Sequence, residues 1–124
     1  MTRLLAVAAG GAVGALARYG LTAAVHTVVD RGFPWGTLAV NLLGSFAMGL
    51  LYVLLLERSA AGPETRALLL TGFLGAFTTF STFSVETLNL LEAGSAGRAA
   101  ANVAVSIAAC LAAAWLGMGL ARQL

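Results

Sequence analysis

Four long apolar segments take up almost the whole of this 124-residue chain. A helix needs about 20 predominantly apolar residues to cross the hydrocarbon core of a bilayer. Hydropathy places such spans at about residues 4–29, 36–56, 66–91 and 99–121. The connections between them are short, which makes consecutive helices antiparallel neighbours. The sequence therefore predicts a single all-α transmembrane domain over residues 1–124, an up-and-down bundle of four helices.

The composition is typical of an integral membrane protein. Hydrophobic residues make up 60% of the chain and charged residues 10%, whereas about a quarter of the residues in a soluble domain are charged. The basic residues are all arginine and are spread thinly, which gives no support to nucleic-acid binding. The sequence contains no metal-ligand cluster, catalytic triad or phosphate-binding loop, so we do not expect an enzyme.

The arginines that flank the spans carry a small orientation signal. They are Arg3, Arg58, Arg66 and Arg122 on the side of the termini, against Arg31 and Arg98 on the other side. Because positive residues favour the cytoplasm, this bias favours cytoplasmic termini. So small a bias also allows insertion in both orientations. An antiparallel homodimer would then supply the two-fold symmetry that many transport folds obtain from an internal repeat, which is not evident here.

The third span contains an unusual polar and aromatic insert at residues 72–86, GFLGAFTTFSTFSVE. Within it, Gly72 and Gly75 precede the β-branched pair Thr78 and Thr79, a weak place for a helix. We therefore expect a broken third helix. The alternative is an unbroken helix whose hydroxyls bond to carbonyls one turn earlier.

Polar side chains recur at helical spacing in three of the spans. The sets are Thr37, Asn41 and Ser45; Thr79, Thr82 and Glu86; and Asn102, Ser106 and Cys110. Asn41 is the most informative, because an amide can donate two hydrogen bonds to an anion. The alternative role is polar contact between helices. Phe80 and Phe83 share a helix face next to the stripe of Thr79, Thr82 and Glu86 and offer electropositive ring edges, although an ordinary aromatic core contact explains them as well.

Arg18 and Glu86 are the charges that lie deepest in apolar sequence. An uncompensated charge at the bilayer centre costs at least about 2.5 kcal/mol. These residues therefore either pair with each other or face water, and Arg18 on its own would mark a vestibule that concentrates anions. His26 and Arg31 lie toward the ends of spans, where anchoring at the membrane surface is the expected role.

The segments GGAVGALARY at 10–19, GTLAVNLLGSF at 36–46 and the insert at 72–86 together resemble the Fluc/CrcB fluoride channel family. The three segments occur in the family's order and spacing, and the resemblance covers essentially all 124 residues. The third segment is the most specific of them. The fourth span is the least diagnostic, although Asn102 and Ser106 occupy the place of a polar track in that family.

The resemblance implies an antiparallel, dual-topology homodimer in the plasma membrane of a prokaryote, or the inner membrane where there are two. It implies fluoride pores, with Asn41, Phe80 and Phe83 as pore residues and Thr79, Thr82 and Ser106 as pore hydroxyls. It also implies a sodium ion at the dimer interface, held by the backbone carbonyls of Gly75 and Thr78, and hence a non-helical backbone at these two residues. The function implied is the exit of cytoplasmic fluoride, which reduces its toxicity.

Two other classes of protein share some of these features. A small dual-topology exporter of cationic drugs has a similar length, but it needs a membrane-embedded carboxylate in its first span. The first span of this chain carries Arg18 and no acidic residue. A structural subunit of a larger membrane complex would bury the polar stripes against its partners and would conduct no ions on its own.

Overall fold

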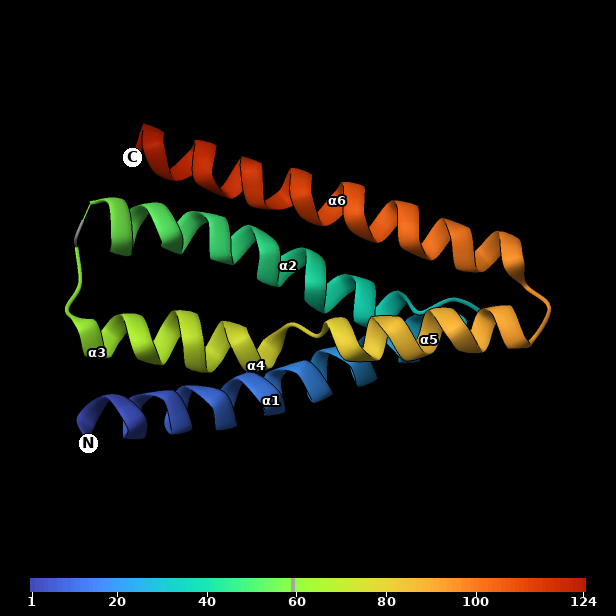
Figure 1. Ribbon diagram of the computed structural model, residues 1–124, viewed down its shortest axis with the longest axis horizontal. Helices are drawn as coiled ribbons and strands as arrows, with labels where there is room; N and C mark the ends of the chain where they lie inside the picture. The colour runs from blue at the N-terminus through green and yellow to red at the C-terminus, as the bar shows by residue number, and fades with distance from the viewer. Residues whose placement is uncertain (59) are drawn as a thin grey trace.

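The computed structural model describes residues 1–58 and 60–124, which form helices joined by short loops. In this described part of the chain, four helical spans are long and apolar enough to cross a membrane. They are Thr2–Val28, Trp35–Glu57, Pro63–Glu92 and Ala96–Gln123. Figure 1 shows that they run lengthwise through the molecule and that both termini lie at the same end. The all-helical class and the four spans are thus confirmed.

The second and third spans are composites of several helical elements. The first span is α1 (Thr2–Val28) and the fourth is α6 (Ala96–Gln123). The second consists of α2 (Trp35–Leu51) followed by the π-helix η1 (Tyr52–Glu57). The third consists of α3 (Pro63–Arg66), the π-helix η2 (Ala67–Leu74), α4 (Gly75–Phe77) and α5 (Phe80–Glu92). A π-helix bonds each residue to the fifth one along, a register that hydropathy does not predict.

Glycines bring the helices of one chain into backbone contact. Five of them lie so close to a neighbouring helix that an added Cβ would collide with its backbone. The pairs are Gly10 with Leu68, Gly14 with Phe73, Gly72 with Val7, Gly49 with Ala114 and Gly117 with Phe46. They join α1 to η2 and α2 to α6. Contacts within a single chain therefore account for these small residues, as in other close helix pairs in membranes.

The third span leaves helical geometry midway along its length. Helix α4 ends at Phe77, and Thr78 (φ −85°, ψ 157°) and Thr79 (φ −151°, ψ 118°) are extended before α5 begins. Figure 1 shows this connection between α4 and α5. Gly75 keeps helical dihedrals (φ −62°, ψ −33°), so the expectation that the backbone departs there is wrong. Its N–H is already bonded to the carbonyls of Leu70 and Gly72, which holds it in the preceding helix.

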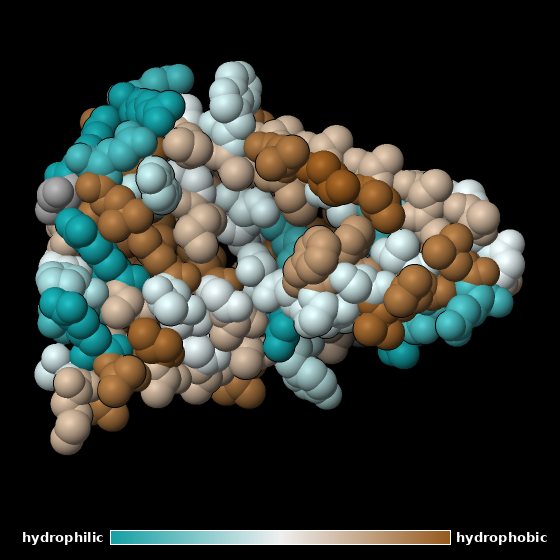
Figure 2. All heavy atoms as spheres, viewed as in Figure 1, coloured by the Kyte–Doolittle hydropathy of each residue, from teal (hydrophilic) through white to brown (hydrophobic). Residues whose placement is uncertain are grey.

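The apolar core and the two ion pairs lie in different parts of the molecule. Val40, Leu74 and Phe77 form a buried cluster next to the extended residues. At the end that carries the termini, two exposed ion pairs join Arg3 to Glu64 and Arg122 to Glu57. Figure 2 shows hydrophilic residues gathered at that end and apolar residues along the flank. This separation suits a molecule whose middle lies in lipid.

Candidate functional site

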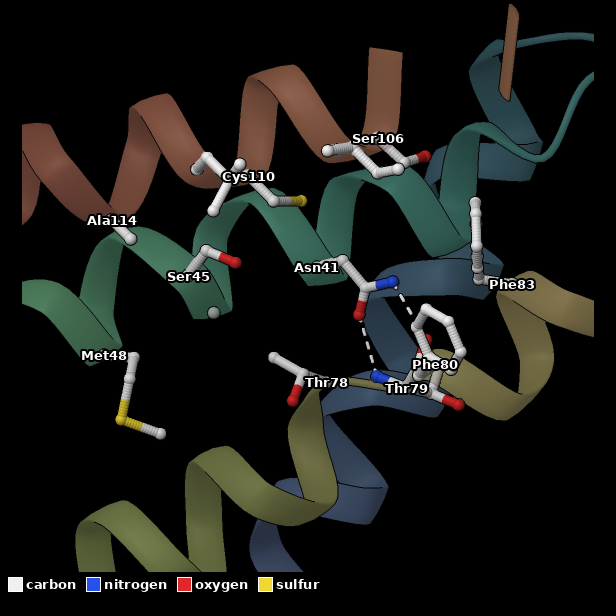
Figure 3. A pocket seen from close by; sticks show the side chains of 13 residues that line it. Asn41, Ser45, Met48, Thr78, Thr79, Phe80, Phe83, Ser106, Cys110 and Ala114 are labelled. Carbon is white, nitrogen blue, oxygen red and sulfur yellow. Dashed lines mark hydrogen bonds between the residues drawn. The ribbon is translucent and has the colours of Figure 1, made fainter. Parts of the chain in front are cut away.

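A cavity of about 430 Å³ lies beside Thr78 and Thr79, between α2, α5 and α6. Its lining includes the polar side chains of Asn41, Ser45, Thr79 and Ser106 together with the rings of Phe80 and Phe83 (Figure 3). Within the part of the chain that the structure describes, no charged side chain lines it. We refer to it as the neutral cavity. Because Thr78 and Thr79 stand halfway along the third span, this cavity lies near the middle of the bilayer.

Asn41 holds the extended backbone of Thr79 by two hydrogen bonds. Its Oδ1 accepts from the Thr79 N–H at 2.7 Å, and its Nδ2 donates to the Thr79 carbonyl at 2.9 Å. Figure 3 shows both bonds bridging from α2 to the third span. An amide nitrogen carries two hydrogens, and the Thr79 carbonyl takes only one of them. The second hydrogen is therefore available to a group in the neutral cavity.

The side chain of Thr79 caps the N-terminus of α5. Its Oγ1 accepts from the Thr82 N–H at 3.2 Å and lies 3.0 Å from the Thr82 hydroxyl and 3.2 Å from that of Ser81. Threonine is a favoured residue at this position because it satisfies one of the unpaired N–H groups of the first turn. The positive end of the α5 dipole thus lies beside a cluster of hydroxyls.

Phe80 and Phe83 form a tilted pair on the first turn of α5, with ring centroids 5.3 Å apart and an interplanar angle of 41°. Phe83 is buried, whereas Phe80 is 77% exposed in the single chain. Across the cavity, the buried Ser106 donates to Asn102 Oδ1 at 3.3 Å. The site therefore combines ring edges, hydroxyls and an amide without a formal charge.

A second cavity, of about 460 Å³, is lined by several charged side chains, and we refer to it as the charged cavity. Its lining includes Arg18, His26, Arg31, Thr37, Thr82 and Glu86. Thr79 lines both this cavity and the neutral one. The buried Thr37 hydroxyl donates to Glu86 Oε1 at 2.9 Å. In the part of the chain that the structure describes, neither Arg18 nor Glu86 takes part in an ion pair.

The structure divides the residues singled out from the sequence between these two cavities. Asn41, Phe80, Phe83 and Ser106 line the neutral cavity, together with Thr78. Thr82, Arg18 and Glu86 line the charged cavity. Thr79 belongs to both. Gly75 lies in α4, one turn before the extended residues, and lines neither of them.

His26 and Arg31 are site residues that the sequence reasoning missed, because both were interpreted as anchors at the membrane surface. Each lines the charged cavity. A signal for His26 was present, since Arg18, Thr22 and His26 follow one another at four-residue intervals and therefore share a face of α1. If these three residues are taken as a polar stripe, their spacing predicts that α1 forms one wall of the charged cavity.

The fold and the site define a small multi-pass membrane protein that keeps uncharged hydrogen-bond donors at bilayer depth. A family model described as "CrcB-like protein, Camphor Resistance (CrcB)" matches residues 5–118. This chain belongs to that family. It is a multi-pass protein of a prokaryotic plasma membrane.

Several curated relatives carry the name "Fluoride-specific ion channel FluC". The relative from Magnetococcus marinus is 54% identical over 116 residues, which cover 94% of each protein. The one from Geobacter sulfurreducens is 51% identical over 124 residues and the full length of both. The relative from Methylococcus capsulatus is 54% identical over 121 residues, 98% of this chain, and there the chain spans about half, 53%, of the relative's length.

Proposed function

We propose that this protein is a passive channel selective for fluoride. The observation that carries the proposal is Asn41, whose amide nitrogen donates one of its two hydrogens to Thr79 and which lines an uncharged cavity at mid-membrane together with the rings of Phe80 and Phe83. Fluoride is small and strongly hydrated, so a path for it must replace lost water with close donors. The names of the relatives support the same ion.

The two cavities suggest an order of events for a permeating ion. Arg18 and Arg31 attract an anion into the charged cavity, where the hydroxyls of Thr79 and Thr82 receive it. From Thr79 the ion passes to Asn41, the phenyl rings and Ser106 in the neutral cavity. No energy source is required, so the gradient sets the direction. Fluoride that has accumulated in the cytoplasm would leave, and its toxicity would fall.

A sodium ion fits the backbone at the α4–α5 connection. In an unbroken helix the N–H groups of Thr79 and Thr82 would bond to the carbonyls of Gly75 and Thr78. Here they donate to Asn41 Oδ1 and to the Thr79 hydroxyl. The two carbonyls thus lose the donors that a helix would give them, and unwound carbonyls suit Na⁺. Replacing sodium by N-methylglucamine should convert dimer to monomer in detergent, and an unchanged dimer fraction would contradict the assignment.

The exposure of Phe80 supports an antiparallel, dual-topology homodimer. A ring assigned to an ion path cannot face lipid, yet Phe80 is 77% exposed in one chain. A second copy packed against this face would cover the ring and close the neutral cavity. The broken third helix of each copy would then lie at the interface, with its extended Thr78 and Thr79 near the two-fold axis.

Efflux from liposomes tests the proposed function directly. Purified protein is reconstituted into vesicles loaded with fluoride, and identical vesicles loaded with chloride serve as the control. We expect rapid fluoride loss and no chloride loss. Loss of both ions would leave a pore but contradict its selectivity. Loss of neither would favour a structural subunit of a larger complex.

A further inference from the structure

We propose that His26 is a positioning residue for Glu86 and makes the fluoride flux of this protein increase as the pH falls. The proposal rests on the proposed function and adds to it a proton-controlled step. It concerns a part of the molecule distinct from the amide, hydroxyls and rings of the neutral cavity. His26 and Glu86 come from different helices, α1 and α5.

His26 and Glu86 stand between two cavities. Both line the charged cavity, and both also line a side cavity of about 290 Å³. The side cavity is bounded by Phe33 and Pro34 of the first connection and by Asn89 and Leu90 of α5. The pair therefore forms part of the wall that the side cavity and the charged cavity share.

Each residue of the pair has one buried atom that is not hydrogen-bonded. Among the residues that the structure describes, His26 Nδ1 and Glu86 Oε2 have no partner, although Glu86 Oε1 accepts from Thr37. A buried polar atom left without a partner is costly, and more so when it is charged. A protonated Nδ1 is a donor and a carboxylate oxygen is an acceptor, so one added proton allows the two atoms to satisfy each other.

The imidazole of His26 packs against α2, and the carboxylate of Glu86 is held by one hydrogen bond, from Thr37. The Nε2 and Cδ2 edge of His26 packs on Gly36, where an added Cβ would lie 3.0 Å from Nε2 and 3.2 Å from Cδ2. In the described part of the chain His26 and Glu86 do not form an ion pair. We infer that protonation of His26 draws Oε2 of Glu86 toward it while Oε1 keeps the Thr37 bond.

The charges around His26 give the sign of the effect. Arg18, Tyr19 and Arg31 line the charged cavity with it, and Asp30 and Arg98 approach Gly32 at the rim of the side cavity. Helix α2 contributes Thr37, which does not titrate. Arginine stays positive and tyrosine neutral between about pH 5 and 8, the range in which histidine changes charge. Glu86 supplies the negative charge of the charged cavity, and a protonated His26 offsets its repulsion of an entering anion.

The test measures fluoride efflux from liposomes between about pH 5.5 and pH 8, the range in which histidine titrates. The wild-type protein should conduct about fivefold faster at the acid end, the size expected for one added charge near an ion entrance. His26→Gln should show the slow rate throughout, and His26→Arg the fast rate throughout. Protein-free vesicles at each pH correct for leakage of HF, and size-exclusion chromatography confirms that each variant is folded.

The outcomes separate this inference from the proposed function. Fluoride flux with the same pH dependence in wild type and His26→Gln would overturn the role of His26 and leave the channel intact. Absence of fluoride flux at every pH would overturn both. A second measurement needs no flux, because His26 is the single histidine of the chain and its imidazole NMR signals are unambiguous. The pH at which they change should move in Glu86→Gln, and an identical titration would contradict the coupling.

Discussion

The neutral cavity and the charged cavity have nearly the same volume, about 430 and 460 Å³, and share Thr79, yet their chemistry is opposite. The charged cavity brings two arginines, a histidine and a carboxylate together along the second half of α1. In the described part of the chain the neutral cavity is lined by uncharged polar side chains, rings and aliphatic side chains. A permeation path must attract an ion and also release it. In the proposed channel, the charged side chains would attract the ion, whereas the neutral donors deep in the membrane would bind it weakly enough to release it.

The difference between the cavities follows from how far each one extends through the bilayer. The charged cavity reaches from Thr79 at mid-span to His26 and Arg31 at and just beyond the end of α1, and full charges are least costly near the membrane surface. Thr78 and Thr79 lie midway along the third span, where a charge would be most costly. Asn41 instead holds the extended backbone there with a neutral amide. The comparison therefore predicts that the two cavities respond differently to substitution.

The largest effect is expected at the rings of the neutral cavity. Phe80→Ile or Phe83→Ile removes the electropositive ring edge but keeps an apolar side chain of similar bulk. We expect either change to abolish fluoride efflux while the protein stays folded and dimeric in size-exclusion chromatography. Phe73, which stacks on Phe77 away from this cavity, provides the matched control, and Phe73→Ile should keep its flux. Unchanged flux in both variants would indicate that Phe80 and Phe83 serve only in packing.

The second largest effect is expected at Asn41, which supports both the backbone and the ion. Asn41→Ala leaves the N–H and carbonyl of Thr79 without partners, at about 1–3 kcal/mol for each buried group. We expect a lower unfolding temperature and a loss of flux of about 100-fold, which corresponds to about 3 kcal/mol. Ser45→Ala, one turn along α2 on the same cavity, should change neither quantity much. Equal effects of the two substitutions would contradict the special role of Asn41.

The fold was predictable from the sequence where the membrane imposes a local rule. A span needs about 20 apolar residues, and four such segments locate the helices. The π-helices η1 and η2 were not predicted, since a hydropathy window cannot distinguish a register of four residues from one of five. Gly75 and Thr78 were both expected to be non-helical because the resemblance implied that their carbonyls hold a sodium ion. Gly75 stays helical, and the departure falls at Thr78 and Thr79, where Asn41 offers the backbone other partners.

The candidate site was predictable in its residue types but not in its contacts. The residues around Asn41, Phe80 and Ser106 stood out because polar groups in an apolar span need an explanation. Their partners could not be read from local patterns, since Asn41 and Thr79 are 38 residues apart and Thr37 and Glu86 are 49 apart. His26 was missed because its position near a span end suggested a surface role, whereas the approach of α5 makes it part of the site.

A smaller effect is expected at the charged cavity, where the proposed role of Arg18 is to attract the ion without holding it. Arg18→Gln should lower the fluoride flux about three- to tenfold at low ionic strength, because steering by a single charge is modest. The deficit should shrink at high salt, which screens the attraction. Arg3→Gln, at the other end of α1 and paired with Glu64, should give no such salt dependence. A salt-independent loss in Arg18→Gln would indicate a structural role.

The smallest effect is expected at Ser106, on the far wall of the neutral cavity. Its hydroxyl donates to Asn102 Oδ1 over a long 3.3 Å, and Asn102 in turn donates to Thr87 at 2.9 Å. Ser106→Ala removes the first donor and leaves the second bond intact, so we expect about a twofold loss of flux, the size of a weak hydrogen bond. Selectivity against chloride should not change, because Asn41 and the rings remain. Ser106→Thr keeps the hydroxyl and should restore the flux; if chloride passes in Ser106→Ala, the far wall contributes to selectivity and the neutral cavity acts as a closed ring of donors.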